Sequence, residues 1–207
     1  MKFLGVDTTN KCAKIILACD SNIKTTSLGE NEKQSENLMN RIDEFLREND
    51  MKIKDINCFG VVVGPGSFTG IRVGVATIKA FAYALNKPVV CVNIFDVVAG
   101  TISDGVCVLK CTSTSCYYGV IEHSKVKEMG VCEFSELQKF AGLKMFSLEE
   151  EHLEELNAYT FNVITNYLDL LTNKFKVLAT KDVYAKTIEP LYLQLSQAER
   201  NLVKKDD

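Results

Sequence analysis

Residues 2–28, KFLGVDTTNKCAKIILACDSNIKTTSL, contain three short segments rich in apolar and β-branched residues. Turn residues such as Asp, Asn, Ser and Thr separate these segments, which is the pattern of consecutive β-strands. The expected strands are Lys2 to Val6, Cys12 to Cys19 and about Ile23 to Leu28. Three strands in succession before any helix predict an antiparallel meander.

Helices and strands alternate after the meander. Apolar residues at helical spacing predict a helix over about 35–49, with Ser35 as its N-cap. We then expect a buried strand at about Cys58–Val63 and a glycine-rich loop at Gly64–Ser67, followed by a long helix that ends at about Leu85. A strand at Val89–Val92 and a short helix at Phe95–Gly100 come next. The order βββ-α-β-α-β is typical of the actin-like nucleotide-binding lobe.

The second half of the chain is expected to form a smaller α/β lobe. Its predicted elements are strands at Val106–Cys111 and Tyr117–Ile121, a helix over about Glu149–Asn173, and a short polar helix or tail at Ser196–Lys204. We therefore expect two lobes of mixed sheet with covering helices. The first covers residues 1–101, with segment 190–207 packing back on it, and the second covers residues 102–189.

The composition is that of a globular protein with little affinity of its own for nucleic acid. The chain has 207 residues, 46% hydrophobic, and a net charge of 24 − 27 = −3, without the basic surface of a freestanding nucleic-acid binder. No apolar run reaches the ~18–20 residues of a membrane span, and Asp7 interrupts the start where a signal peptide would be apolar. We expect a cytoplasmic protein.

The eight cysteines are expected to be reduced core thiols. No two of them are spaced as C-x-x-C, which disfavours a zinc ribbon or a thioredoxin-type redox pair. Most lie in β-rich apolar runs, where free cysteine behaves as a small hydrophobic residue.

Asp7-Thr8-Thr9 ends the first strand and has two interpretations. In a phosphate-binding hairpin, threonine hydroxyls and turn amides donate to phosphate oxygens, and the aspartate holds a metal ion. This interpretation would make the chain a small actin-like ATPase or kinase that uses Asp7 and Mg-ATP. The alternative is an ordinary hairpin turn with a local Asp/Thr hydrogen bond.

The loop Gly64 to Gly70 follows a strand and opens a helix, a position where backbone amides can bind an anion. It is not a Walker A loop, because Ile71-Arg72 rather than lysine follows Gly70. Three residues separate Gly66 from Gly70, and the loop follows a meander, so a dinucleotide-binding oxidoreductase is a weaker alternative.

The helix after this loop carries two stripes. One consists of small residues and the other is apolar, and only Arg72 and Lys79 are charged between residues 67 and 85. Such a helix is normally buried on most of its circumference. We expect the apolar stripe to cover its own sheet and the small stripe to let another helix approach closely. That helix is the one of residues 35–49, and both helices can in addition join a bundle across a two-fold or pseudo-two-fold interface. The stripes are Gly70, Gly74, Thr77, Ala80 and Ala84, and Ile71, Val75, Ile78, Ala82 and Leu85.

Two other clusters favour structural roles. The acidic run Glu149-Glu150-Glu151 with Glu154-Glu155 suits the solvated start of a helix. The hydroxyl-rich segment from Cys111 to Cys116 indicates a turn rather than a nucleophile loop, because neither histidine is an evident base.

Three motifs together resemble the TsaB (YeaZ) family of bacterial tRNA threonylcarbamoyladenosine biosynthesis proteins: Gly64–Gly74, Leu4–Thr9, and Glu189–Gln194 with Ser196–Arg200. The resemblance covers the whole chain. It implies an α/β, actin-like ASKHA (ribonuclease H-like) fold with a reduced second lobe. It also implies a non-catalytic subunit that pairs with TsaD, the metal-dependent subunit that transfers a threonylcarbamoyl group to N6 of adenosine 37 in tRNA. TsaE, an ATPase, joins the complex.

The same resemblance implies no catalytic residue, no metal and no required cofactor in this chain. ATP and magnesium would belong to the complex, and this chain would bind tRNA only indirectly, through its partners. Without TsaD the small-residue helix would expose apolar surface, so we expect the isolated chain to form a homodimer through the same surface. Asp7, Thr8 and Thr9 would be a vestigial phosphate site, and Gly74→Leu would weaken pairing with TsaD while leaving the fold intact. The implied partner interface is Ser67, Phe68, Thr69, Gly70, Arg72, Val73, Gly74, Thr77 and Ala80, with Leu38 and Ile42.

Two positions depart from the family pattern. Gln34 stands where relatives often carry histidine, and Thr112-Ser113-Thr114 stands where many have Asp-Ala-Arg. No role is carried over to these positions.

Overall fold

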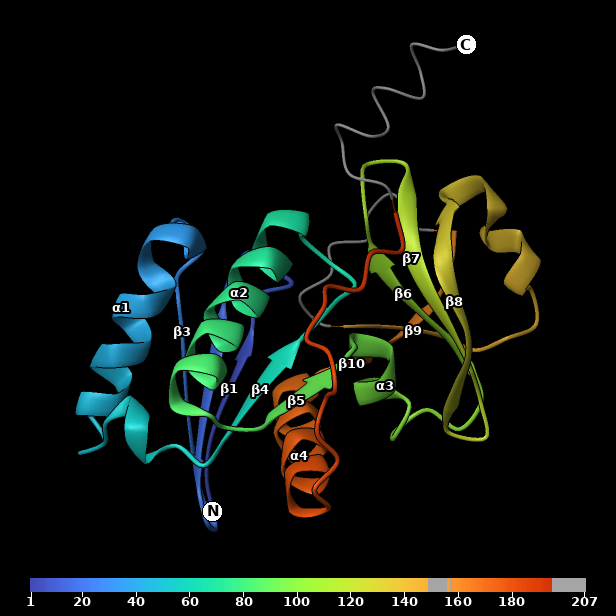
Figure 1. The fold of residues 1–207 in the computed structure, drawn as a ribbon. Coiled ribbons are helices and arrows are strands. Elements are labelled where there is room, and N and C mark those ends of the chain that lie inside the picture. The colour runs from blue at the N-terminus through green and yellow to red at the C-terminus, as the bar shows by residue number, and fades with distance from the viewer. Residues whose placement is uncertain (149–155, 157, 195–207) are drawn as a thin grey trace. The chain divides into compact units, whose positions relative to one another are not determined.

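The computed structural model describes residues 1–148, 156 and 158–194 (Figure 1). The chain forms two compact units, Met1–Ile94 with Leu168–Leu191, and Phe95–Tyr167 with the segment from Tyr192. Each unit is built on a five-stranded sheet.

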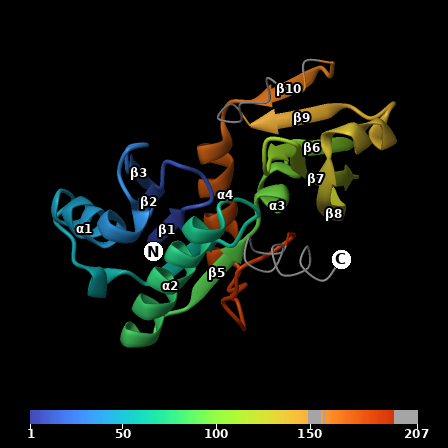
Figure 2. The ribbon, with the colours of Figure 1, turned by 90° about the horizontal axis from the view of Figure 1, so that it is seen from above.

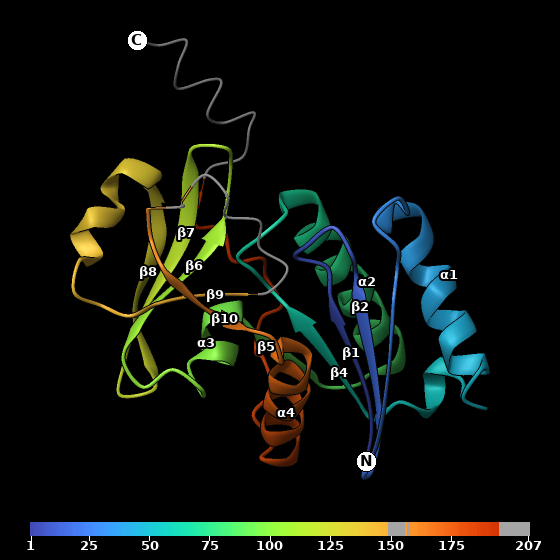
Figure 3. The same cartoon turned by 180° about the vertical axis from the view of Figure 1, so that it is seen from behind.

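The sheet of the first unit begins with the predicted meander (Figure 3). β2 pairs antiparallel with β1 and β3, and β4 and β5 extend the sheet in parallel on the other side of β1. The strand order is β3-β2-β1-β4-β5, which is the ribonuclease H-like arrangement. The strands are β1 (Lys2–Asp7), β2 (Lys14–Cys19), β3 (Asn22–Ser27), β4 (Cys58–Val62) and β5 (Val89–Val92).

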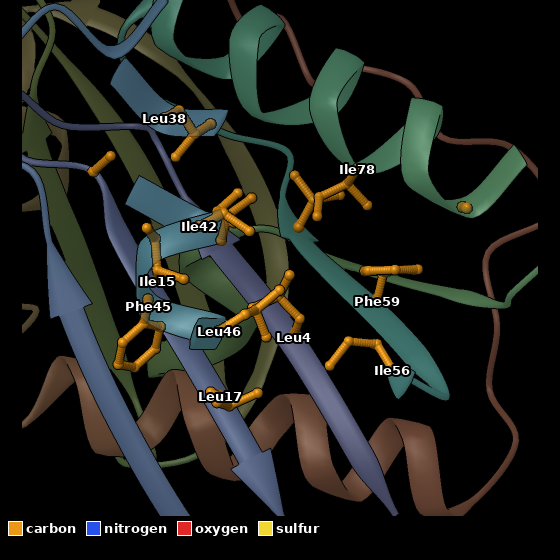
Figure 4. Packing of buried hydrophobic residues seen from close by; sticks show 14 of the residues in the cluster. Leu4, Ile15, Leu17, Leu38, Ile42, Phe45, Leu46, Ile56, Phe59 and Ile78 are labelled. Atoms are coloured by element: carbon orange, nitrogen blue, oxygen red, sulfur yellow. The ribbon is translucent and has the colours of Figure 1, made fainter. Parts of the chain in front are cut away.

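Two helices, α1 (Gln34–Arg47) and α2 (Phe68–Leu85), cover one face of this sheet (Figure 2). The short 3-10 helix η1 (Ile53–Asp55) leads into β4. Strand and helix side chains meet in one apolar cluster (Figure 4) that includes Leu4, Ile15, Leu17, Leu38, Ile42, Phe45, Leu46, Phe59 and Ile78. Helix α1 begins one residue before the expected N-cap: Lys33 occupies the cap without a side-chain hydrogen bond, and Ser35 lies inside the first turn.

The opposite face of the sheet is covered by α4 (Tyr167–Thr180), which comes from much later in the chain. Phe175 of this helix packs against Phe3, with ring centroids 5.2 Å apart. Gly5 and Gly60 make room for the two rings, since a Cβ at Gly60 would lie 2.4 Å from the ring of Phe3 and 2.9 Å from that of Phe175. The first unit therefore includes residues 168–189, which the expected division had assigned to the second lobe, together with residues 190 and 191.

The second unit repeats the topology of the first. β6, β7 and β8 form an antiparallel meander, and β9 and β10 extend it in parallel, in the order β10-β9-β6-β7-β8. Gly119 of β7 makes room for Phe95 of α3 on one face, and η2 covers the other. The elements are α3 (Ile94–Val98), β6 (Gly105–Lys110), β7 (Ser115–Glu122), β8 (Lys125–Glu133), η2 (Phe134–Phe140), β9 (Met145–Leu148) and β10 (Phe161–Ile164).

The predicted helix over residues 149–173 is wrong at residues 161–164 and confirmed at residues 167–173. Residues 161–164 form β10, which pairs with β9, and the helix begins at Tyr167 and continues to Thr180. The spacing of Phe161, Ile164, Leu168 and Leu171 suits a helix, but the pairing partner of β10 lies far back in the sequence, where no local pattern can reveal it. The acidic run at 149–155 and the tail at 196–204 lie outside the described residues.

Candidate partner-binding helix and the turn beneath it

The glycine-rich loop between β4 and α2 lies against the turn that joins β1 to β2. Gly64 and Gly66 have φ angles of 132° and 154°, which strongly favour glycine. The Ser67 amide donates to the Thr9 carbonyl oxygen at 2.7 Å, and a Cβ at Gly66 would lie 2.5 Å from that same oxygen. The loop residues therefore allow backbone to pack on backbone.

The first turns of α2 continue this contact. Ser67 is the N-cap of α2, and its Oγ accepts a hydrogen bond from the Gly70 amide at 3.2 Å. A Cβ at Gly70 would lie 2.0 Å from the Thr8 carbonyl oxygen, and one at Gly74 would lie 2.2 Å from Thr8 Oγ1. The two glycines thus face the turn inside the chain. This corrects the expectation that they face a partner and that Gly74→Leu leaves the fold intact, because a leucine side chain would collide with Thr8.

The turn itself is closed by its own side chains. Asp7 Oδ1 accepts hydrogen bonds from the Thr9 amide at 2.9 Å and from Thr9 Oγ1 at 2.6 Å. The exposed fractions of Asp7, Thr8 and Thr9 are 3%, 0% and 2%. The turn has the local Asp/Thr hydrogen bond of the second interpretation, and all three side chains are buried.

Gln34 fixes the far end of the same turn to α1. Its Nε2 donates to the carbonyl oxygens of Asn10 at 2.5 Å and Lys11 at 2.9 Å. Its Oε1 is buried, and within the described residues neither this atom nor Thr8 Oγ1 has a hydrogen-bond partner. Sequence reasoning missed this role, since the only signal was that the residue departs from a family pattern.

The outward side of α2 is exposed and carries mainly small side chains. Only six of its eighteen residues are buried, and Tyr83 is 90% exposed. The Arg72 guanidinium lies 4.0 Å from the centre of the Phe68 ring. We call this side the outer α2 face; it consists of Thr69, Arg72, Val73, Ala76, Thr77, Ala80, Tyr83 and Ala84.

By length and composition alone, α2 is the one described helix that could cross a membrane. In the structure its inner side packs into the core of the first unit through Ile71, Val75 and Ile78. We therefore treat α2 as a core helix with one uncovered side.

The expected interface residues fall into two groups. Ser67, Phe68, Thr69, Arg72, Val73, Thr77 and Ala80 are exposed or half-buried. Leu38 and Ile42 are each 1% exposed and lie in the core with the strands. These two residues cannot contact another chain, because the apolar side of α1 faces its own sheet; the outward side of α1 exposes Met39 instead.

The hydroxyl-rich segment of the second unit forms a self-contained turn. Thr112 Oγ1 lies 2.7 Å from Ser115 Oγ and accepts hydrogen bonds from the Thr114 and Ser115 amides. Over residues 1–148, 156 and 158–194, no group of three or more His, Cys, Asp or Glu side chains is placed to hold a metal ion.

No disulfide joins any of the eight cysteines, all of which lie within the described residues, and half of them are core residues. Cys58, Cys107, Cys116 and Cys132 are buried and the others are half-buried. Burial raises the pKa of Cys58 to about 12 and that of Cys91 to about 11.

Comparison with known sequences connects the chain with tRNA modification proteins. The family model described as TsaD, tRNA N6-adenosine threonylcarbamoyltransferase, matches residues 30–178. The TsaB proteins of Bacillus subtilis and Escherichia coli are 30% identical over 100 residues and 24% identical over 93 residues. These alignments cover 48% and 45% of this chain and 44% and 40% of the relatives, so the chain matches less than half the length of these curated proteins.

Comparison of structures supports the same conclusion for the fold. YeaZ from Pseudomonas aeruginosa superposes with a TM-score of 0.72 at 15% identity, covering 93% of this chain and 99% of that one. This likeness extends over both units, including the segments beyond the sequence alignments. The chain therefore belongs to the tRNA N6-adenosine threonylcarbamoyltransferase family.

Proposed function

We propose that this chain is a non-catalytic partner subunit in the synthesis of N6-threonylcarbamoyladenosine in tRNA, and that it binds and activates TsaD through the outer α2 face. The observation that carries the proposal is this face, where Ala76, Ala80, Tyr83 and Ala84 are exposed on one side of a helix with few charges. Apolar side chains grouped on one exposed side of a helix favour an interaction site.

The chemistry of the face suits a helix of another chain. Ala76, Ala80 and Ala84 follow one another at intervals of four, so their small side chains let a second helix approach closely. Tyr83 stands at the end of this row almost fully exposed, and tyrosine is among the residues that most often dominate binding energy. Arg72, held over the Phe68 ring, supplies charge at the other end of the face.

The relation of the chain to TsaD itself supports a paired arrangement. Because the matching family model is that of the transferase, the partner shares an ancestor with this chain, and related chains can pair through equivalent surfaces about a pseudo-two-fold axis. The closed turn at Asp7, whose carboxylate accepts two hydrogen bonds from Thr9, supports a binding role over phosphate chemistry. We further propose that TsaE joins this pair and that tRNA is bound by the partners.

The proposal is tested by reconstituting threonylcarbamoyladenosine formation on tRNA with TsaD, TsaE and the synthase that makes threonylcarbamoyl-adenylate, with and without this chain. We expect modification to require this chain, and expect Ala80→Arg to lose both the complex with TsaD on gel filtration and the activity. Val177→Arg on α4 is the matched control, since Val177 is also exposed but lies on the helix that covers the other face of the sheet. Full modification without the chain, or with the Ala80→Arg variant, would contradict the proposal.

A further inference from the structure

Two buried thiols face each other across neighbouring strands of the second unit. Cys116 of β7 and Cys132 of β8 occupy directly opposite positions in the antiparallel pair. Their Sγ atoms are 3.7 Å apart, and their exposed fractions are 0% and 4%. In the strand registers of the described residues, no other two cysteines stand opposite each other.

The backbone geometry at this pair is compatible with a covalent bond. Directly opposite residues of antiparallel strands have Cα atoms about 4.5 or 5.5 Å apart, and both values lie within the ~4.4–6.8 Å that disulfides require. The sulfur atoms must approach by about 1.7 Å to reach the ~2.05 Å bond length. Side-chain rotation with a small approach of the strands provides that movement.

We propose that Cys116 and Cys132 form a reversible disulfide when the protein meets hydrogen peroxide, and that this bond locks β7 to β8. One thiolate attacks a peroxide oxygen: an S–O bond forms, the O–O bond breaks, and hydroxide leaves to become water. The second sulfur attacks the resulting sulfenic acid, forming the S–S bond and releasing a second water. The two sulfurs lose two electrons in total, and the peroxide gains them.

The surroundings of the pair determine how the reaction proceeds. Burial raises the pKa of both thiols, most strongly that of Cys116, while the ammonium of Lys139 opposes the shift at each. The thiolate is the reactive form, so the raised pKa values make the first step slow. Cys132, exposed to 4% against 0% for Cys116, is the thiol that peroxide reaches first, and Cys116 resolves it. The bond then closes a ring around the β7–β8 hairpin and restrains the start of η2, which begins two residues after Cys132. This inference depends only on the second unit and is independent of the proposed function.

The test is made on the full chain in native buffer. The protein is treated with excess hydrogen peroxide or with dithiothreitol, its remaining thiols are alkylated, and it is digested without reduction. We expect the oxidised sample to contain a peptide pair joining Cys116 to Cys132, to retain six alkylated cysteines out of eight, and to revert with dithiothreitol. We also expect the oxidised protein to unfold at a higher temperature than the reduced protein.

Cys132→Ala must abolish the linked peptides and the shift in unfolding temperature. Cys107→Ala, another buried cysteine of the same sheet that lies opposite Gly119, must retain both. Eight alkylated cysteines after peroxide treatment of the native wild-type chain, or linkage of either residue to Cys111 instead, would overturn the inference. Peptide mapping of the wild type distinguishes these outcomes even if a variant fails to fold.

Discussion

Gly74 shows how one missing methyl group decides where a helix can lie. A Cβ at this position would be 2.2 Å from Thr8 Oγ1 but 3.3 Å from the other two Thr8 side-chain atoms. The hydroxyl is buried and has no hydrogen-bond partner among the described residues, so the clash comes almost entirely from this atom. Helix α2 therefore rests on the β1–β2 turn at the distance that glycine allows.

We predict that Gly74→Ala lowers the free energy of unfolding by about 1–3 kcal/mol through overpacking, although alanine is intrinsically the better helix former by about 1 kcal/mol. Thr8→Ala removes the clashing hydroxyl, so the double variant should recover most of the loss. Urea unfolding of the four proteins gives the coupling energy. Gly100→Ala, where the nearest atom would be 3.8 Å away, is the control and should change stability little. Additive effects of Gly74→Ala and Thr8→Ala would contradict this account.

At the scale of elements, the first unit could largely be predicted from sequence. Its strands are locally apolar and its helices have clear apolar periodicity, so β1 to β5, α1 and α2 lie close to their expected bounds. The small-residue stripe of α2 was also visible, but spacing does not show which neighbour a stripe faces. The inner half, with Gly70 and Gly74, contacts Thr8 within the chain, and the outer half carries the exposed alanines. The pairing of β10 with β9 could not be predicted, because the spacing of apolar residues within a segment does not show which other strand it pairs with.

The outer α2 face should also drive self-association of the isolated chain. We predict a homodimer that Tyr83→Ser converts toward monomer, because a side chain that is 90% exposed in the single chain gains most from burial at a helix–helix contact. Light scattering over a range of concentrations measures this. Val177→Ser is the control, since it removes an exposed apolar side chain elsewhere and should leave the dimer intact. A wild-type monomer at high concentration would contradict the prediction.

At the scale of the whole molecule, the same strand topology occurs twice, and each unit is built from two separate stretches of the chain. The order of the second sheet repeats that of the first with β6 to β10 in the places of β1 to β5, although the sequence shows no repeat. The chain passes into the second unit near Ile94 and returns for α4 at Leu168. Neither unit is therefore a continuous piece of sequence, which is why a single boundary near residue 101 did not describe them.

Because the first unit includes α4 from later in the sequence, the structure predicts which fragments of the chain fold. Residues 1–101 alone lack α4, so Phe3 and the glycine-lined face of the sheet would lose the cover of Phe175, which is completely buried. Losing a buried phenylalanine alone costs about 3–5 kcal/mol, comparable with the ~5–15 kcal/mol stability of a typical domain. We expect this fragment to bind hydrophobic dye and to lack a cooperative thermal transition. Joining residues 1–94 to residues 168–191 through a flexible linker should restore a cooperative transition, measured by circular dichroism, and Phe175→Ala in the joined fragment should abolish it again. Cooperative unfolding of residues 1–101 alone would show that α4 is dispensable for the first unit.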